Sequence, residues 1–200
     1  MREHLLDCFR DRGAILVTPT SQLGQTEIFL HKTAQDLVAA SVLVPIIDRP
    51  KGLTVLFTQR SQNLKNHPGQ VSFPGGRAET QDKDVVETAL RESEEEIGLH
   101  PGKVRVLGQL DLCLTGTGFK VTPIVGLVEE PLTLNLSTNE VAETFEVPLH
   151  LLLDEKRYRT YTMALPTGKS REFYIFDWPQ RYIWGATAKM LVNLRTILGS

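Results

Sequence analysis

The stretch GGRAETQDKDVVETALRESEEEIGL, Gly75 to Leu99, is the part of the chain where residue spacing and residue chemistry agree. Asp84 followed three residues later by Glu87 is typical of a capping box, in which side chains accept the first backbone N–H groups of a helix. Gly98 is typical of the residue that ends a helix. The pattern therefore predicts a short helix that begins after Asp84 and ends at Ile97.

This predicted helix carries two kinds of side chain. Apolar or small residues share one stripe: Val86, Leu90, Ser93 and Ile97. Carboxylates at positions i, i+3 and i+4 fall well away from that stripe: Glu92, Glu95 and Glu96. We expect one face of the helix to be buried and the other to present the carboxylates.

The acidic side of the helix has two interpretations. A charge run is ordinarily a solvated face, but like charges at i, i+4 cost about 0.2–0.5 kcal/mol per pair, and exposed carboxylates in the last turn oppose the helix dipole by roughly 0.3–1 kcal/mol each. A divalent cation on Glu92 and Glu96, with Glu95 nearby, would offset that repulsion. Oxygen ligands favour Mg²⁺ or Mn²⁺, and Mg²⁺ usually adds water and substrate phosphate, which indicates phosphate chemistry.

At these residues the chain resembles the Nudix box of Nudix hydrolases, which cleave nucleoside diphosphates linked to another group. The matching run is RESEEEIGL, residues 91–99, after a Gly-Gly pair. Two positions depart from the family pattern. Asp82 stands in place of glutamate, one residue further from Arg91 than usual, and Ser93 stands where a hydrophobic residue is usual. The departures touch the first acidic position and leave the metal-binding core intact.

A second signature lies directly upstream. The run LFTQRSQNLKNHPGQVSFPGG, residues 56–76, resembles the signature of coenzyme A pyrophosphatases within that family. Phe57 replaces a leucine, and Lys65 replaces an arginine, which keeps the charge but loses the planar fork. Segments further along also resemble this subfamily: 118–126, 139–149 and 182–191. The resemblance therefore runs from about Val38 to the C-terminus.

The resemblance implies an α/β fold, the Nudix α/β/α sandwich with a mixed sheet between helices and the box as a loop-helix-loop. We expect a single domain over residues 1–200, with its core at about 38–198. Arg91 is then expected to hold the box loop or the glutamates in place by ion pairing. Its alternative role is a surface pairing with Glu87 or Glu95.

The expected metal ligands are Glu92 and Glu96, with Glu95 nearby. A carboxylate must also accept a proton from the attacking water, and we expect Glu95 to be this general base. Glu140 and Glu143 are alternatives, because a loop carboxylate outside the box can bind metal or activate water in related hydrolases. Either of them is otherwise an exposed surface residue.

The expected substrate site lies on and beside loop 61–73, which leads into the Gly-Gly pair. Its basic side chains would come within reach of the metal and of the substrate phosphates: Arg60, Lys65 and His67. Each is otherwise a solvated loop charge. Gly75 and Gly76 complete this expected substrate-binding set.

The composition indicates which kinds of partner and which cellular compartment to expect. A net charge of −2 provides no field for a polyanion, so we expect a small phosphorylated substrate rather than nucleic acid. Cys8 and Cys113 form no disulfide framework, which fits a reducing compartment. The N-terminus lacks a signal-peptide core and no apolar run approaches a membrane span of about 18 residues, so we expect a cytoplasmic protein. A homodimer stays open.

The remaining chain shows the periodicities of strands and terminal helices. Helices are expected at 1–12 and 186–198, and strands at 38–47, 53–60, 104–114, 120–128, 132–136, 142–147, 158–165 and 171–177. Weaker strand signals lie at 14–17 and 27–30.

The expected function is metal-dependent hydrolysis of the pyrophosphate of coenzyme A or its thioesters, giving 3′,5′-ADP and 4′-phosphopantetheine, free or acylated. Two alternatives remain. One is a Nudix hydrolase of ADP-ribose or another dinucleotide, and the other is a Nudix-fold binding module without catalysis. The three box glutamates favour catalysis over the binding module.

Overall fold

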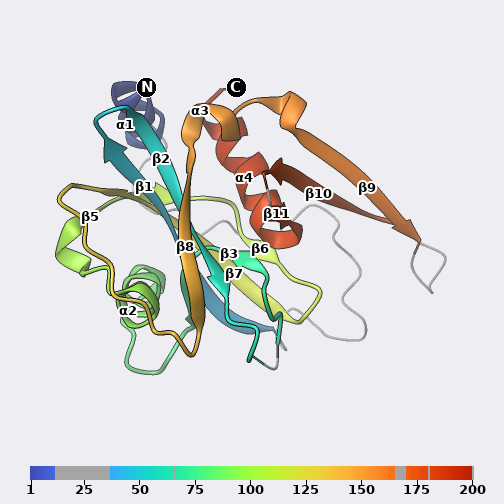
Figure 1. Cartoon of the computed structure of the whole chain (residues 1–200), viewed down its shortest axis with the longest axis horizontal. Coiled ribbons are helices and arrows are strands. Elements are labelled where there is room, and N and C mark those ends of the chain that lie inside the picture. Colours follow the sequence, from blue (N-terminus) through green and yellow to red (C-terminus); the bar gives the residue numbers. More distant parts are fainter. Residues whose placement is uncertain (12–36, 65, 165–169, 180, 200) are drawn as a thin grey trace.

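A computed structural model of the chain describes residues 1–11, 37–64, 66–164, 170–179 and 181–199 (Figure 1). Its helices are α1 (Arg2–Asp11), α2 (Val85–Ile97), α3 (Leu149–Leu152) and α4 (Gly185–Ile197), with 3-10 turns η3 (Pro101–Lys103) and η4 (Glu155–Arg157). The helices expected at both ends of the chain and in the box are thereby confirmed. Within the described ranges, no helix has the length and apolar character needed to cross a membrane.

The main sheet is mixed. Its strands are β1 (Val38–Arg49), β2 (Gly52–Arg60), β3 (Val71–Ser72), β4 (Gly75–Arg77), β5 (Val104–Gln109), β6 (Cys113–Leu114), β7 (Phe119–Val128) and β8 (Val141–Pro148). Neighbouring strands follow the order β3-β2-β1-β7-β5 across the sheet. Three further strands pair at its sides: β4 with β1, β6 with β7 and β8 with β2. β1 forms an antiparallel hairpin with β2 and is parallel to β7.

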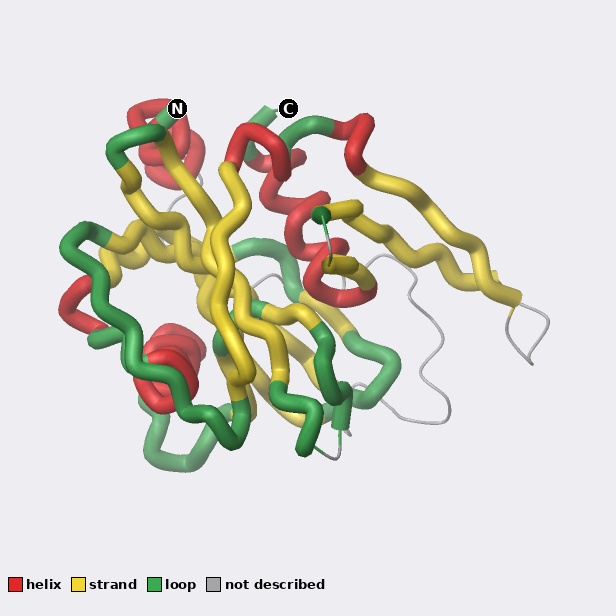
Figure 2. Tube along the Cα trace, viewed as in Figure 1, coloured by secondary structure: helices red, strands yellow, loops and turns green. Residues whose placement is uncertain are grey.

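Helices cover both faces of this sheet. Leu43 and Ile47 of β1 point to one side, where they pack with Ala89 and Ile97 of α2. The alternate β1 residues lie in the other core cluster, which contains side chains of α1 and α4. This three-layer arrangement is the expected α/β/α sandwich (Figure 2).

A second, three-stranded sheet adjoins α4. Its strands are β9 (Tyr158–Ala164), β10 (Ser170–Trp178) and β11 (Arg181–Trp184), in the order β11-β10-β9. The two strands expected at 158–165 and 171–177 are confirmed as β9 and β10, which pair antiparallel with Phe173 opposite Tyr161. Buried Phe176 and Ile183 join the α4 side of the core, so α4 lies between this sheet and the main sheet.

Two strand predictions differ from the structure. Residues 132–136 form no strand. The backbone N–H of Asn135 donates to Ile97 O at the end of α2, at 2.9 Å, instead of to a neighbouring strand. The strand expected at 104–114 is broken into β5 and β6, since residues 110–112 leave the ladder. The weak strand signals at 14–17 and 27–30 lie outside the described residues.

Candidate active site

Helix α2 begins and ends at the residues that its sequence specifies. The Asp84 carboxylate accepts hydrogen bonds from the backbone N–H groups of Val86, at 2.8 Å, and Glu87, at 2.9 Å. Gly98 follows the helix with φ of 69°, and its N–H bonds back to the carbonyls of the last turn. The caps hold the helix at both ends, so the register of its glutamates is fixed.

Burial on α2 departs from the expected division into an apolar face and an acidic face. Ser93 is buried, and its hydroxyl donates to the Ala89 carbonyl at 2.7 Å, which explains how a polar residue occupies the position where the family pattern has an apolar one. Glu96 is only 5% exposed. The expectation that the three carboxylates lie away from the core is therefore wrong for Glu96.

The buried Glu96 carboxylate has one backbone donor. Oε2 accepts a hydrogen bond from the N–H of Gly75 at 3.1 Å, and pairing between β4 and β1 holds that glycine in place. Burial raises the pKa of Glu96 to about 7, although the Gly75 N–H and the positive charge of Arg60 oppose the shift. Negative charge on neighbouring Glu92 and Glu140 raises the pKa further.

Glu92 lies against the second glycine of the Gly-Gly pair. A Cβ atom at Gly76 would stand 2.5 Å from the Glu92 carboxylate, so any larger residue there would displace it. Burial raises the pKa of Glu92, and the charges of Glu95 and Glu140 add to this, while Arg91 opposes it. The site therefore contains carboxylates whose negative charges are costly in the metal-free protein.

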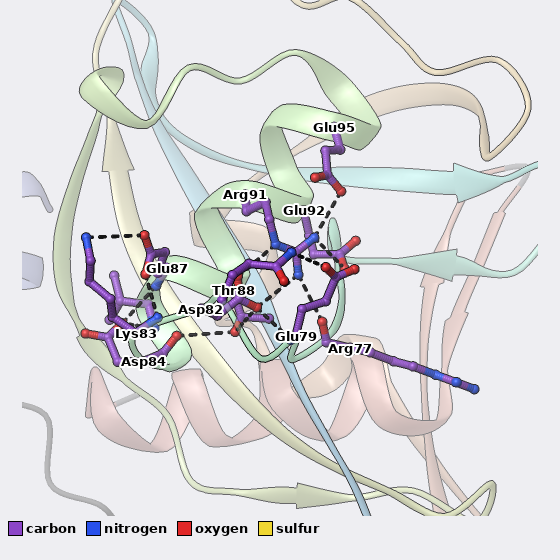
Figure 3. Close-up of polar contacts among 12 residues, drawn as sticks. Arg77, Glu79, Asp82, Lys83, Asp84, Glu87, Thr88, Arg91, Glu92 and Glu95 are labelled. Atoms are coloured by element: carbon purple, nitrogen blue, oxygen red, sulfur yellow. Dashed lines mark hydrogen bonds and ion pairs between the residues drawn. The ribbon is translucent and has the colours of Figure 1, made fainter.

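Arg91 connects the box loop to the helix (Figure 3). Its guanidinium donates to both carboxylate oxygens of Asp82, at 2.9 and 3.0 Å, and to the Arg77 carbonyl at 3.0 Å. The same group reaches Glu92 at 3.1 Å and Glu95 at 3.0 Å. Arg91 thus holds the loop and two box glutamates together by ion pairing.

Asp82 is the buried end of this network, with its side chain only 3% exposed. Hydrogen bonds from Arg91 hold the pKa of the Asp82 carboxyl well below its usual range. The sequence left this first acidic position in doubt, since it departs from the family pattern in residue type and spacing. In the structure its role is to neutralise and orient Arg91.

Glu140 and Glu143 have different surroundings. Glu140 ends a segment that is bound to α2, where Ser137 N donates to Glu96 O at 2.9 Å, and its charge acts on both Glu92 and Glu96. Glu143 forms an ion pair with Arg181 at 2.7 Å. The structure therefore brings Glu140 to the box carboxylates and engages Glu143 with β11.

The three basic residues expected to bind substrate, Arg60, Lys65 and His67, differ in their surroundings. Arg60, at the end of β2, is half-buried, and its positive charge acts on Glu96. Its Nε has no hydrogen-bond partner among the described residues. His67 is exposed, and its ring makes no hydrogen bond with a box carboxylate in the described part of the chain. Lys65 lies outside the described residues.

Comparison with known proteins agrees with this geometry. A family model for the NUDIX domain matches residues 37–165. The chain belongs to the Nudix family. A Yersinia enterocolitica protein described as "uncharacterized Nudix hydrolase NudL" is 44% identical to this Nudix chain over 156 residues, 78% of each protein. A Photorhabdus laumondii protein of the same description is 45% identical over 155 residues, 78% of this chain and 82% of the relative.

The solved structures agree on the fold. A MutT/nudix family protein from Enterococcus faecalis matches with a TM-score of 0.52 and 13% identity, covering 96% of this chain and 72% of the other. The family model and the two relatives place the chain among Nudix hydrolases, which cleave pyrophosphate bonds in nucleoside diphosphate derivatives and generally use divalent cations.

The box carboxylates suit a divalent cation that takes few protein ligands and fills its other positions with water or substrate. Among the described residues, no group of three or more His, Cys, Asp or Glu side chains is arranged to hold a metal ion. One reason is that Arg91 draws Glu92 and Glu95 toward itself. Mg²⁺ commonly takes only one or two protein carboxylates. Half-buried Glu92 and buried Glu96, whose negative charges repel each other, could supply that share.

Proposed function

We propose that the chain is a coenzyme A pyrophosphatase that hydrolyses coenzyme A or its thioesters to 3′,5′-ADP and 4′-phosphopantetheine, free or acylated. The carrying observation is the place of Arg60. This residue belongs to the run at 56–76 that resembles the coenzyme A pyrophosphatase signature, and its positive charge acts on the box carboxylate Glu96. A cation with an unsatisfied buried Nε in that position suits a substrate phosphate.

The proposed roles follow the geometry. Glu92 and Glu96 would hold Mg²⁺ or Mn²⁺, which when bound neutralises pyrophosphate oxygens and lowers the pKa of a water ligand. Arg60 would contact the phosphates, with His67 and Lys65 as further candidates from the same loop. Glycine is required at positions 75 and 76 because a side chain at Gly75 would collide with Val42 and one at Gly76 with the Glu92 carboxylate.

The proton acceptor is Glu140 or Glu95. The negative charge of Glu140 acts on both Glu92 and Glu96. Among the described residues, Glu140 forms no ion pair. Glu95 is 58% exposed, and its carboxylate is engaged in an ion pair with Arg91 at 3.0 Å. Glu143 is the weakest candidate because Arg181 engages it. Loss of kcat with a changed pH profile in Glu140→Gln but not in Glu95→Gln would decide for Glu140.

The decisive experiment is product analysis. Purified protein is incubated separately with coenzyme A and ADP-ribose, with Mg²⁺, with Mn²⁺ and with chelator, and the products are separated by mass. We expect metal-dependent 3′,5′-ADP from coenzyme A, and loss of turnover in Glu96→Gln. Full turnover of Glu96→Gln at saturating Mg²⁺ would remove Glu96 from the metal site.

Other outcomes favour the alternatives. Cleavage of ADP-ribose alone would retain the box chemistry and reject coenzyme A as substrate. Absence of cleavage in both reactions would favour a Nudix-fold binding module. We also propose that the enzyme acts in the cytoplasm on a small-molecule substrate, in keeping with its lack of a strong net charge.

A further inference from the structure

Arg77 is an exposed cation beside the box with no role in the reaction described above. It directly follows Gly76, at the end of β4. Its guanidinium lies over the Phe119 ring, 5.3 Å from the ring centroid. No carboxylate forms an ion pair with it in the part of the chain that the structure describes. Its charge is therefore available to an external anion.

The backbone of Arg77 is held to the catalytic network. Its carbonyl accepts a hydrogen bond from Arg91 at 3.0 Å, and the same guanidinium binds Glu92. The side chain, however, points away from the box carboxylates (Figure 3). Arg77 thus extends the site outward from a fixed point beside Glu92.

The sheet places the stacked pair at the same end as the box. Arg77 is paired with Ala40 at the start of β1, and Phe119 is paired with Val38, two residues earlier. Alternate residues share one face of a sheet, so Arg77 and Phe119 lie on the same face, opposite to α2. The end of β2, with Arg60, lies at this end too because β1 and β2 are antiparallel.

The cation–π contact with Phe119 occupies no N–H group of the guanidinium, and within the described ranges these donors make no hydrogen bond. An arginine plane covered on one face by an aromatic ring keeps its donor fork for bidentate binding of a phosphate. Val38, next to Phe119 in the β1–β7 register, is 39% exposed and adds an apolar surface. A phosphate together with an aromatic base matches these features.

We propose that Arg77, seated on Phe119, binds the 3′-phosphate of the adenosine half of coenzyme A. This inference rests on the proposed function and adds the residue that distinguishes coenzyme A from substrates that lack a third phosphate. Arg77 acts in binding, since it lies outward of the carboxylates that carry the chemistry.

The test compares coenzyme A with 3′-dephospho-coenzyme A in wild type, Arg77→Ala and Phe119→Leu. Loss of a charged hydrogen bond predicts that Arg77→Ala raises KM for coenzyme A about tenfold or more, leaves kcat within about twofold, and changes KM for the dephospho compound little. Phe119→Leu should act in the same direction with a smaller effect. Arg105→Ala is the matched control, because Arg105 is an exposed arginine at the far end of the sheet.

Calorimetry gives a second readout without turnover. We expect 3′,5′-ADP to bind wild type about tenfold or more tightly than AMP, and this ratio to fall to near unity in Arg77→Ala. Equal losses for both substrates and both ligands would overturn the role of Arg77 while coenzyme A hydrolysis stands. Failure of wild type to cleave coenzyme A would overturn the proposed function together with this inference.

Discussion

Burial makes the charge of Glu96 unfavourable in the metal-free protein. Its pKa in the folded chain is about 7, against a reference value of 4.5. A raised folded pKa means that the protonated form stabilises the fold. This contribution is fully present below pH 4.5 and is lost as the pH rises through 7. The stability of the metal-free protein should therefore decline over that window.

The magnitude follows from the shift. At roughly 1.4 kcal/mol per pKa unit, Glu96 alone accounts for up to about 3 kcal/mol between pH 4.5 and 8. Urea unfolding of the metal-free protein at pH 5 and pH 8 measures this difference, and Glu96→Gln should reduce it. An unchanged difference in Glu96→Gln would show that other groups cause the pH dependence.

Asp82 and Arg91 form the most buried ion pair of the box, with side chains 3% and 18% exposed. Asp82→Ala leaves the Arg91 guanidinium without its bidentate partner and should lower the free energy of unfolding by about 2–4 kcal/mol. Activity should fall as well, because Arg91 positions Glu92. The comparison is Asp7→Ala, which breaks the exposed pair with Arg10 and should cost less than about 1 kcal/mol. Equal losses in chemical denaturation would contradict the role assigned to Asp82.

At the scale of elements, α2 and the segment from Leu132 to Glu140 act as one unit. Asn135 and Ser137 bond to carbonyls at the end of the helix, so the position of Glu140 depends on that of Glu96. Gly98 permits this close approach, since a Cβ atom there would lie 2.8 Å from Asn135 N.

Gly98→Ala should therefore lower kcat, because both the helix end and the segment must shift. Gly52→Ala is the control for backbone strain. Gly52 has φ of 119°, in the region that favours glycine, but it lies in the β1–β2 turn with no atom within 4 Å of the added Cβ. Both variants should lose stability, whereas only Gly98→Ala should lose kcat at saturating substrate and metal. A similar kcat in the two variants would show that the position of the segment from Leu132 to Glu140 does not affect catalysis.

These elements also show how far the sequence alone could lead. Local signals fix α2, because Asp84 and Gly98 act on their own backbone neighbours. Buried Glu96 accepts a hydrogen bond from the backbone N–H of Gly75, at the start of β4. Gly75 and Glu96 are far apart in the sequence, and hydrophobic periodicity does not predict such a contact. The segment 132–136 has the apolar alternation of a strand, but the end of α2 takes its backbone donors. Tertiary contacts of this kind decided each feature that the sequence missed.

At the scale of the whole molecule, the box places the carboxylates of buried Glu96 and half-buried Glu92 within the sandwich. Its carboxylates repel one another, and the positive charges of Arg91 and Arg60 offset only part of that repulsion. A bound divalent cation should relieve the remainder and stabilise the fold as a whole, since it binds the folded chain and has no preformed site in the unfolded one.

Mn²⁺ or Mg²⁺ at about one hundred times its dissociation constant should raise the melting temperature by about 5–10 °C for a chain of this size. The shift should be larger at pH 8 than at pH 5, because a cation must displace the proton that Glu96 holds below pH 7. Thermal unfolding with metal and with chelator at both pH values checks this, with Glu92→Gln/Glu96→Gln as the variant that should not respond. An equal shift in that double variant would place the cation elsewhere. Loss of the shift in a double variant that still folds without metal would show that the cation stabilises the fold through these two carboxylates.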